Sequence, residues 1–177
     1  MKRGTTALTK VMRGTTAIQK IMRGTTFIWE NWIYYVGSLF EMTSLNTPSP
    51  FVASATGSGY PTGVWMVFNT NDDAWSPQTG TNFTAVIDLV NPVRMAEFTI
   101  KMNYQAYQIA SFYVEASNDN SNWTTLWDSG GRGGSFTETH AVDSVVAYRY
   151  YRVRMWASST TGWTWSRFTI NKYYRKG

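Results

Sequence analysis

The sequence predicts an all-β protein: a β-sandwich preceded by a short repetitive β arm. Aromatic residues make up 16% of the chain and charged residues only 15%, with Thr, Ser, Gly and Asn abundant. That composition favours strands and turns over helices. From residue 43 onward, short β-prone segments alternate with turn-forming clusters, as in sandwiches and barrels. Residues 1–30 repeat a short pattern in register, which indicates stacked identical units.

The arm contains three copies of the pattern Arg-Gly-Thr-Thr, which begin at Arg3, Arg13 and Arg23. Each is followed by a run that contains apolar and β-branched residues. Because glycine adopts positive φ readily, each copy is interpreted as a turn followed by a short strand.

The apolar residues of the arm are too few to form a core within one chain. We therefore expect them to be buried in a cyclic homo-oligomer such as a trimer, or against a partner protein. A flexible basic tail is the alternative. The residues expected to anchor and oligomerise the arm are Arg3, Arg13, Ile18, Ile21, Arg23, Ile28 and Trp29.

The charge of the chain lies in the arm. Residues 1–30 hold six basic residues against Glu30 alone, which accounts for the whole net charge of +5. The arm and the neutral body are therefore expected to meet different partners. No apolar stretch is long enough to span a membrane, and Met1-Lys2-Arg3 is not followed by the apolar segment of a signal peptide. The chain has no Cys, which excludes a disulfide framework and a thiolate metal site.

Residues 31–42 form a hydrophobic junction, which we expect to pack against the sandwich, a neighbouring chain or both. The predicted division places the arm and the junction in residues 1–42 and the sandwich in residues 43–177. The predicted strands of the sandwich are 51–56, 64–69, 83–89, 93–102, 111–117, 123–127, 136–141, 147–156 and 163–172. Alternation in the run 147–156 places Tyr151, Val153 and Met155 on one face and Arg152 and Arg154 on the other.

Three segments of the body, in matching order and spacing, resemble motifs of one family. Phe83 to Val93 resembles the apolar-Asp-Leu-Gly-x-Pro segment of discoidin domains. Ser117 to Trp123 resembles their Ser-Asn-Asp-Gly-x-x-Trp hairpin, and Arg149 to Arg152 resembles their Arg-Tyr-Tyr-Arg strand. The resemblance covers about residues 43–171. It implies the fold called discoidin, factor-type C or galactose-binding-like, an eight-stranded jelly-roll sandwich.

The resemblance implies that ligands bind to loops at one end of the sandwich. An aromatic platform with a few polar groups is typical of sugar sites. The candidate ligand-binding residues are Tyr60, Trp65, Tyr104, Tyr107, Arg132, Trp156, Trp163 and Trp165, with Asn103, Gln105 and Gln108 as added hydrogen-bonding groups. Trp75, Trp123 and Trp127 are expected to have structural roles.

We expect no enzyme activity, no cofactor and no metal. His140, the only histidine, lies near Asp143 and Ser144 in sequence, but hairpin neighbours rarely form a triad, and the acidic residues are scattered. The alternative is a calcium ion bound by Asp72 and Asp73. Calcium-binding members of the family often carry Phe-Asp-Gly after an early strand and a late Glu, whereas this chain has Phe68-Asn69-Thr70 and Ser166-Arg167 at these places.

The arm also resembles Gly-Thr-Thr-x-Ile-x-Lys-Val repeats near the ends of phage tail and virion proteins. The predicted function is a phage virion surface protein of the fibre, decoration or tail type, assembled in the host cytoplasm. Its sandwich would bind host-surface carbohydrate, while its arm would contact capsid or tail proteins. The alternatives are a purely structural virion protein and a carbohydrate-binding module of a bacterial protein. Nucleic acid is not an expected partner, because the body is neutral and the arm has no aromatic residue before Phe27.

Overall fold

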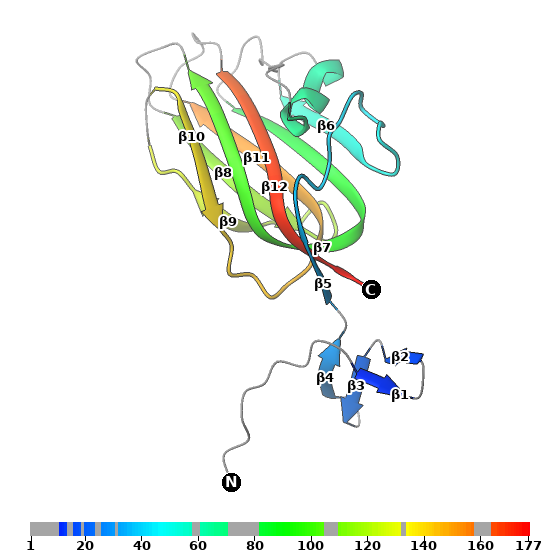
Figure 1. The fold of residues 1–177 in the computed structure, drawn as a ribbon. Helices are drawn as coiled ribbons and strands as arrows, with labels where there is room; N and C mark the ends of the chain where they lie inside the picture. The colour runs from blue at the N-terminus through cyan, green and yellow to red at the C-terminus, as the bar shows by residue number, and fades with distance from the viewer. Residues whose placement is uncertain are drawn as a thin grey trace.

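The computed structural model describes residues 11–13, 16–18, 20–23, 26–30, 32–57, 61–70, 82–104, 110–131, 134–157 and 164–177. The predicted all-β class is confirmed, because these residues form an antiparallel β-sandwich with one short helix (Figure 1). The arm contributes β1 (Val11–Arg13), β2 (Thr16–Ile18), β3 (Lys20–Arg23) and β4 (Thr26–Glu30). The sandwich contains β5 (Trp32–Val36), β6 (Val52–Gly57), η1 (Pro61–Phe68), β7 (Asn82–Tyr104), β8 (Ala110–Ser117), β9 (Thr124–Asp128), β10 (Phe136–Ala141), β11 (Tyr148–Ala157) and β12 (Thr164–Lys176).

The long strand β7 belongs to both layers of the sandwich. Its first half pairs with β6 on one side and β11 on the other. The layer continues from β11 to β8 and from β8 to β9. Its second half pairs with β10 and with β12, which pairs in turn with β5. The two layers are therefore β6-β7-β11-β8-β9 and β5-β12-β7-β10. The predicted strands 83–89 and 93–102 are the two halves of this one bent strand.

The bend of β7 lies between Asp88 and Val93. Val90 adopts a φ of 63°, and its N–H donates to Asp88 Oδ1 at 2.7 Å. Arg149 of β11 donates to both oxygens of the same carboxylate, from Nε at 2.8 Å and from Nη2 at 2.7 Å. The hydrogen bond from Arg149 holds the pKa of Asp88 below its usual value. The buried Tyr151 hydroxyl donates to the Val93 carbonyl at 2.6 Å, so β11 holds the bend on both sides.

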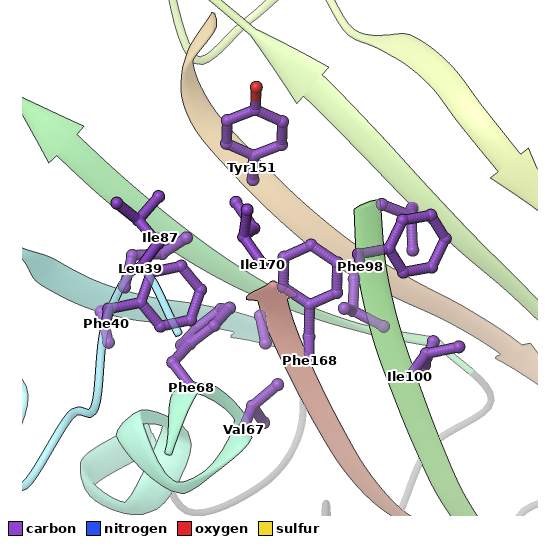
Figure 2. Packing of buried hydrophobic residues seen from close by; sticks show 14 of the residues in the cluster. Leu39, Phe40, Val67, Phe68, Ile87, Phe98, Ile100, Tyr151, Phe168 and Ile170 are labelled. Carbon is purple, nitrogen blue, oxygen red and sulfur yellow. The ribbon is translucent and has the colours of Figure 1, made fainter. Parts of the chain in front are cut away.

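The core fills the space between the two layers. Figure 2 shows its aromatic centre, where Phe40, Phe68, Phe98 and Phe168 come from different segments of the chain. The ring of Phe68 lies 5.8 Å from that of Phe40 and 6.4 Å from that of Phe168, both edge to face. The predicted alternation in β11 is confirmed: Tyr151, Val153 and Met155 are buried, whereas Arg152 and Arg154 are partly exposed.

The hydrophobic junction packs against the sandwich, as expected. Strand β5 pairs with the end of β12, and Gly37 N donates to Asn171 O at 2.8 Å. Leu39, Phe40 and Met42 then enter the core, where none is more than 6% exposed. These three side chains therefore contribute to the stability of the sandwich itself.

The turn between β8 and β9 is organised by Asp119. Its Oδ1 accepts the N–H groups of Ser121 at 2.9 Å and Asn122 at 2.7 Å. The side-chain amide of Asn122 donates to Oδ2 at 2.7 Å and is the largest cause of the lowered pKa of Asp119. Asn120 has a φ of 59°, at the position where the family motif carries glycine.

Residues 64–69 do not form the predicted strand. They lie mostly within η1, because Val64, Val67 and Phe68 are spaced to bury one helical face against the core. Pro61 begins this helix, a position that tolerates the missing N–H of proline. The run of valines and aromatics from 64 to 68 resembles a strand only when tertiary packing is ignored.

The repeats of the arm form two hairpins. β1 pairs with β2 and β3 with β4, with Arg13 opposite Thr16 and Arg23 opposite Thr26. The two residues between the strands of each hairpin, 14–15 and 24–25, lie outside the described residues. Six of the anchoring candidates lie on these strands, namely Arg13, Ile18, Ile21, Arg23, Ile28 and Trp29, whereas Arg3 lies outside the described residues. Their role in oligomerisation stays a prediction.

We predict that Val90→Gly stabilises the protein. A β-branched residue is strained at positive φ by about 1–2 kcal/mol, and the greater freedom of glycine in the unfolded chain offsets only part of the relief. Urea unfolding should show a net gain of about 1 kcal/mol. Val145→Gly is the matched control, since Val145 is exposed and has no positive φ. A loss of stability in Val90→Gly as large as in the control would contradict the strain at Val90.

We also predict that the sandwich requires the junction. A shortened chain that begins at Asn31 keeps Leu39, Phe40 and Met42, whereas one that begins at Thr43 loses their burial. At about 1.5–3 kcal/mol for each buried side chain, the second chain should lose on the order of 5 kcal/mol. Thermal unfolding of the two chains, followed by circular dichroism, measures the difference. Equal melting temperatures would mean that the junction is dispensable.

Candidate ligand-binding end of the sandwich

Several strand ends meet at one end of the sandwich, which we call the loop end. Gly57 of β6 lies opposite Phe83, and Trp156 of β11 lies between Asn82 of β7 and Ser111 of β8. In the second layer, Thr164 of β12 lies opposite Tyr104, which ends β7. Several segments that follow or precede these strands in sequence lie outside the described residues, namely 58–60, 71–81, 105–109, 132–133 and 158–163. The bend of β7, the chain entry through β5 and the end of β12 lie at the other end, which we call the bend end (Figure 1).

Three of the eight ligand-binding candidates lie at the loop end on described residues. Trp156 lies near the end of β11, Tyr104 ends β7, and Trp165 lies at the start of β12. Four others lie outside the described residues: Tyr60, Tyr107, Arg132 and Trp163. The polar candidate Asn103 is on β7 opposite Trp165, whereas Gln105 and Gln108 are outside the described residues.

Trp65 departs from the expected loop position. It lies on η1, is partly buried, and packs against the core. The helix holds Trp65 against the sandwich, because the face formed by Val64, Val67 and Phe68 is buried in the core.

Trp156 is the described aromatic side chain most clearly available at the loop end. It is 47% exposed, whereas its neighbour Met155 is buried. Alternation along β11 places Trp156 on the outer face of its layer, the same face as Arg152 and Arg154. A central strand thus presents an exposed indole ring at the loop end.

Below Trp156, the outer face carries a cluster of charges in which two arginines pair with the single carboxylate of Glu115. Arg152 Nε donates to Glu115 Oε2 at 2.7 Å, and Arg154 Nε and Nη2 donate to Oε2 and Oε1 at 3.1 and 3.2 Å. Burial works to raise the pKa of Glu115, which is 4% exposed, but the hydrogen bonds from Arg154 and Arg152 outweigh it and lower the pKa.

Aromatic rings cover both arginines of this cluster. The Arg152 guanidinium lies 4.0 Å from the centre of the Trp123 ring, and that of Arg154 lies 3.9 Å from the centre of the Tyr113 ring. The arginines therefore serve as supports for the strands. Sequence reasoning missed the cluster, because it depends on the register that places Glu115 opposite Arg152. The structural role expected for Trp123 and Trp127 is confirmed by these contacts, while Trp75 lies outside the described residues.

His140 has a structural environment on β10. Its Nε2 lies 3.0 Å from Glu138 Oε2, and its ring packs against Trp127 and Phe98 at 4.8 and 5.4 Å between ring centres. Nearby, Ser144 Oγ donates to the Val146 carbonyl.

Within the described ranges, no group of three or more His, Asp or Glu residues is placed to hold a metal ion. Asp72 and Asp73, the calcium alternative, lie outside those ranges. Among the described helical residues, none forms a segment suited to crossing a membrane.

Comparison with protein families matches residues 51–170 to the F5/8 type C domain. A variant of chitosan-binding module 1 from a chitosanase/glucanase of Paenibacillus sp. IK-5 is a similar structure, with a TM-score of 0.54 and 18% identity over 80% of this chain and 100% of that one. CpGH89CBM32-6 of Clostridium perfringens has a TM-score of 0.53 and 15% identity, over 76% and 99% of the two chains.

A third similar structure is CpGH89CBM32-5 of Clostridium perfringens, solved in complex with GalNAc-β-1,3-galactose. It has a TM-score of 0.50 and 13% identity, over 75% of this chain and 99% of that one. No curated protein matches the chain in sequence. At these identities the structural likeness establishes the fold, and the predicted discoidin-like sandwich is confirmed.

Proposed function

Because the chain belongs to the F5/8 type C domain family, we propose that it is a non-catalytic protein that binds carbohydrate at the loop end of its sandwich. One observation carries the proposal: the strand ends that hold Trp156, Tyr104 and Trp165 meet at one end of the sandwich. Domains of this type are typically non-catalytic.

The chemistry of the loop end suits a sugar. The apolar C–H face of a pyranose packs on an aromatic ring, and its hydroxyl edges need a few polar partners. Trp156 offers an exposed ring on a central strand. Two of the similar structures are named for sugar ligands, chitosan and GalNAc-β-1,3-galactose, which supports the same ligand class for this chain.

We expect Trp156→Ala to weaken glycan binding about tenfold, the effect of losing one aromatic stacking contact with its buried area. The ligands to test first are a chitosan oligosaccharide and GalNAc-β-1,3-galactose, by isothermal titration calorimetry. Val146→Ala, an exposed apolar residue between β10 and β11, is the matched control and should bind like the original protein. Equal affinity of Trp156→Ala and the control for a bound glycan would remove Trp156 from the site.

We further propose that the arm joins several chains into one particle, the setting of a virion surface protein. The support is the repeat, which resembles phage virion and tail repeats, and the two hairpins that it forms. One aromatic site binds a glycan weakly, and several copies on one particle would raise avidity by orders of magnitude. A carbohydrate-binding module of a bacterial protein is the second candidate, favoured by the bacterial sources of the similar structures. A purely structural virion protein would bind no glycan at all.

The oligomeric state tests the role of the arm. Light scattering should find an oligomer for the full chain and a monomer for a chain beginning at Asn31, because only the full chain keeps the hairpins. Binding to a glycan-coated surface should be retained far longer by the full chain, while affinity for a soluble monovalent glycan should be equal. If both chains are monomers, self-association through the arm is wrong, and the arm would dock on another protein.

A further inference from the structure

In the described part of the chain, the longest run of exposed large apolar side chains lies on strand β5. Residues 33–36 are all exposed, and Val36 reaches 72%. The next longest run is the pair Val145 and Val146. The later residues of the hydrophobic junction enter the core, so the junction has one part that folds with its own chain and one part that faces outward. An exposed apolar run of this kind marks a surface for association.

Strand β5 is also an open edge of its layer. Among the described strands it pairs with β12 alone, so its second edge has no strand beside it. Edge strands are usually protected from association by charged residues, prolines or bulges. Residues 32–36 contain no charged residue and no proline, and their register with β12 is regular. The edge therefore lacks the features that would keep another chain away.

The tyrosine rings of β5 are held in place by β12. The ring of Tyr34 lies 5.0 Å from that of Tyr174, and the ring of Tyr35 stacks on that of Tyr173 at 5.2 Å. The two residues of each pair lie directly opposite each other in the sheet. Side chains that are already held in this way lose little conformational freedom on association, which favours a contact through them.

The charge beside Val36 is compensated within the chain. Lys172 lies opposite Val36 and is paired with Glu97. Arg94 lies one strand further away, with its guanidinium over the ring of Tyr174 at 4.4 Å. Two copies can therefore bring Val36 into contact without setting an unpaired Lys172 of one copy against that of the other.

The arm identifies what covers this surface. Glu30 ends β4 and Trp32 begins β5, so only Asn31 separates the last strand of the arm from β5 (Figure 1). Two residue steps span at most about 7 Å. Arms that join several copies therefore also bring their β5 strands together, at a high effective concentration. The surface that each β5 meets is then the same strand of another copy.

We infer that β5 is a second contact between copies of this chain: in the assembly held by the arms, the exposed side chains of β5 pack against those of β5 in a neighbouring copy. This inference rests on the proposed assembly through the arm and extends its interface onto the sandwich. A strand of five residues is far smaller than the roughly 800 Å² per partner that stable interfaces bury. The contact therefore strengthens the assembly but does not create it, and a chain that begins at Asn31 stays monomeric although it keeps β5.

The test is dissociation of the full chain on dilution, followed by light scattering. Val36→Glu should raise the concentration at which half of the assembly dissociates at least tenfold, because a charge would be buried between the copies. Thr124→Glu is the matched control and should leave this concentration unchanged. Thr124 is likewise an exposed β-branched residue on an edge strand, but it lies on β9, at the edge of the other layer. Circular dichroism should show the same strand content in both variants.

The alternative outcomes separate this contact from the role of the arm. Equal dissociation of Val36→Glu and Thr124→Glu would refute the β5 contact and leave assembly through the arm intact. A monomeric full chain would refute both, and β5 would then face a different protein. An oligomer of the chain beginning at Asn31 that Val36→Glu dissociates would support the β5 contact and refute the arm. If Val36→Glu does not fold, Val36→Thr replaces it, because threonine keeps the β-branched shape while its hydroxyl should still weaken the assembly.

Discussion

The bend of β7 is the constraint on which the rest of the sandwich depends. One continuous strand supplies a central member to both layers, so the geometry between Asp88 and Val93 sets how the layers face each other. β11 pins this geometry twice, through the ion pair of Arg149 and the hydroxyl of Tyr151. β7 runs from the loop end to the bend and then back. Its two ends, Asn82 and Tyr104, therefore both lie at the loop end. The candidate site is therefore assembled by the same feature that closes the core.

The outer face shows how a charged group adds rigidity beside a binding surface. Removing one partner from a buried ion pair costs about 3–5 kcal/mol, because the other charge is left without compensation. Glu115 is buried and joined to two arginines, each of which also lies on an aromatic ring. This arrangement ties β8 to β11 directly below Trp156. An indole on such a support loses little freedom on binding, which favours affinity.

Much of the fold could be predicted from the sequence, because the relevant patterns are local. Alternation assigned the buried face of β11, and the discoidin motifs located the bend and the turn after β8. Val90 and Asn120 stand where these motifs carry glycine, and both retain positive φ. What local patterns could not predict depends on tertiary contacts: the helix at 61–68 and the pairing of Glu115 across strands. The candidate site was predicted as a set of residues in loops at one end, but Trp65 lies partly buried on η1, because the packing of this helix depends on tertiary contacts.

The position of β5 makes the two ends of the sandwich different. The chain from the arm enters the sandwich at Trp32, beside the end of β12, and this is the end remote from Trp156. Chains gathered by their N-termini would thus all face the same way, with the loop ends on the outside of the assembly and the bend ends next to the point of attachment. A ligand at the inner end would meet crowded neighbours, whereas one at the outer end would be reached from open solution.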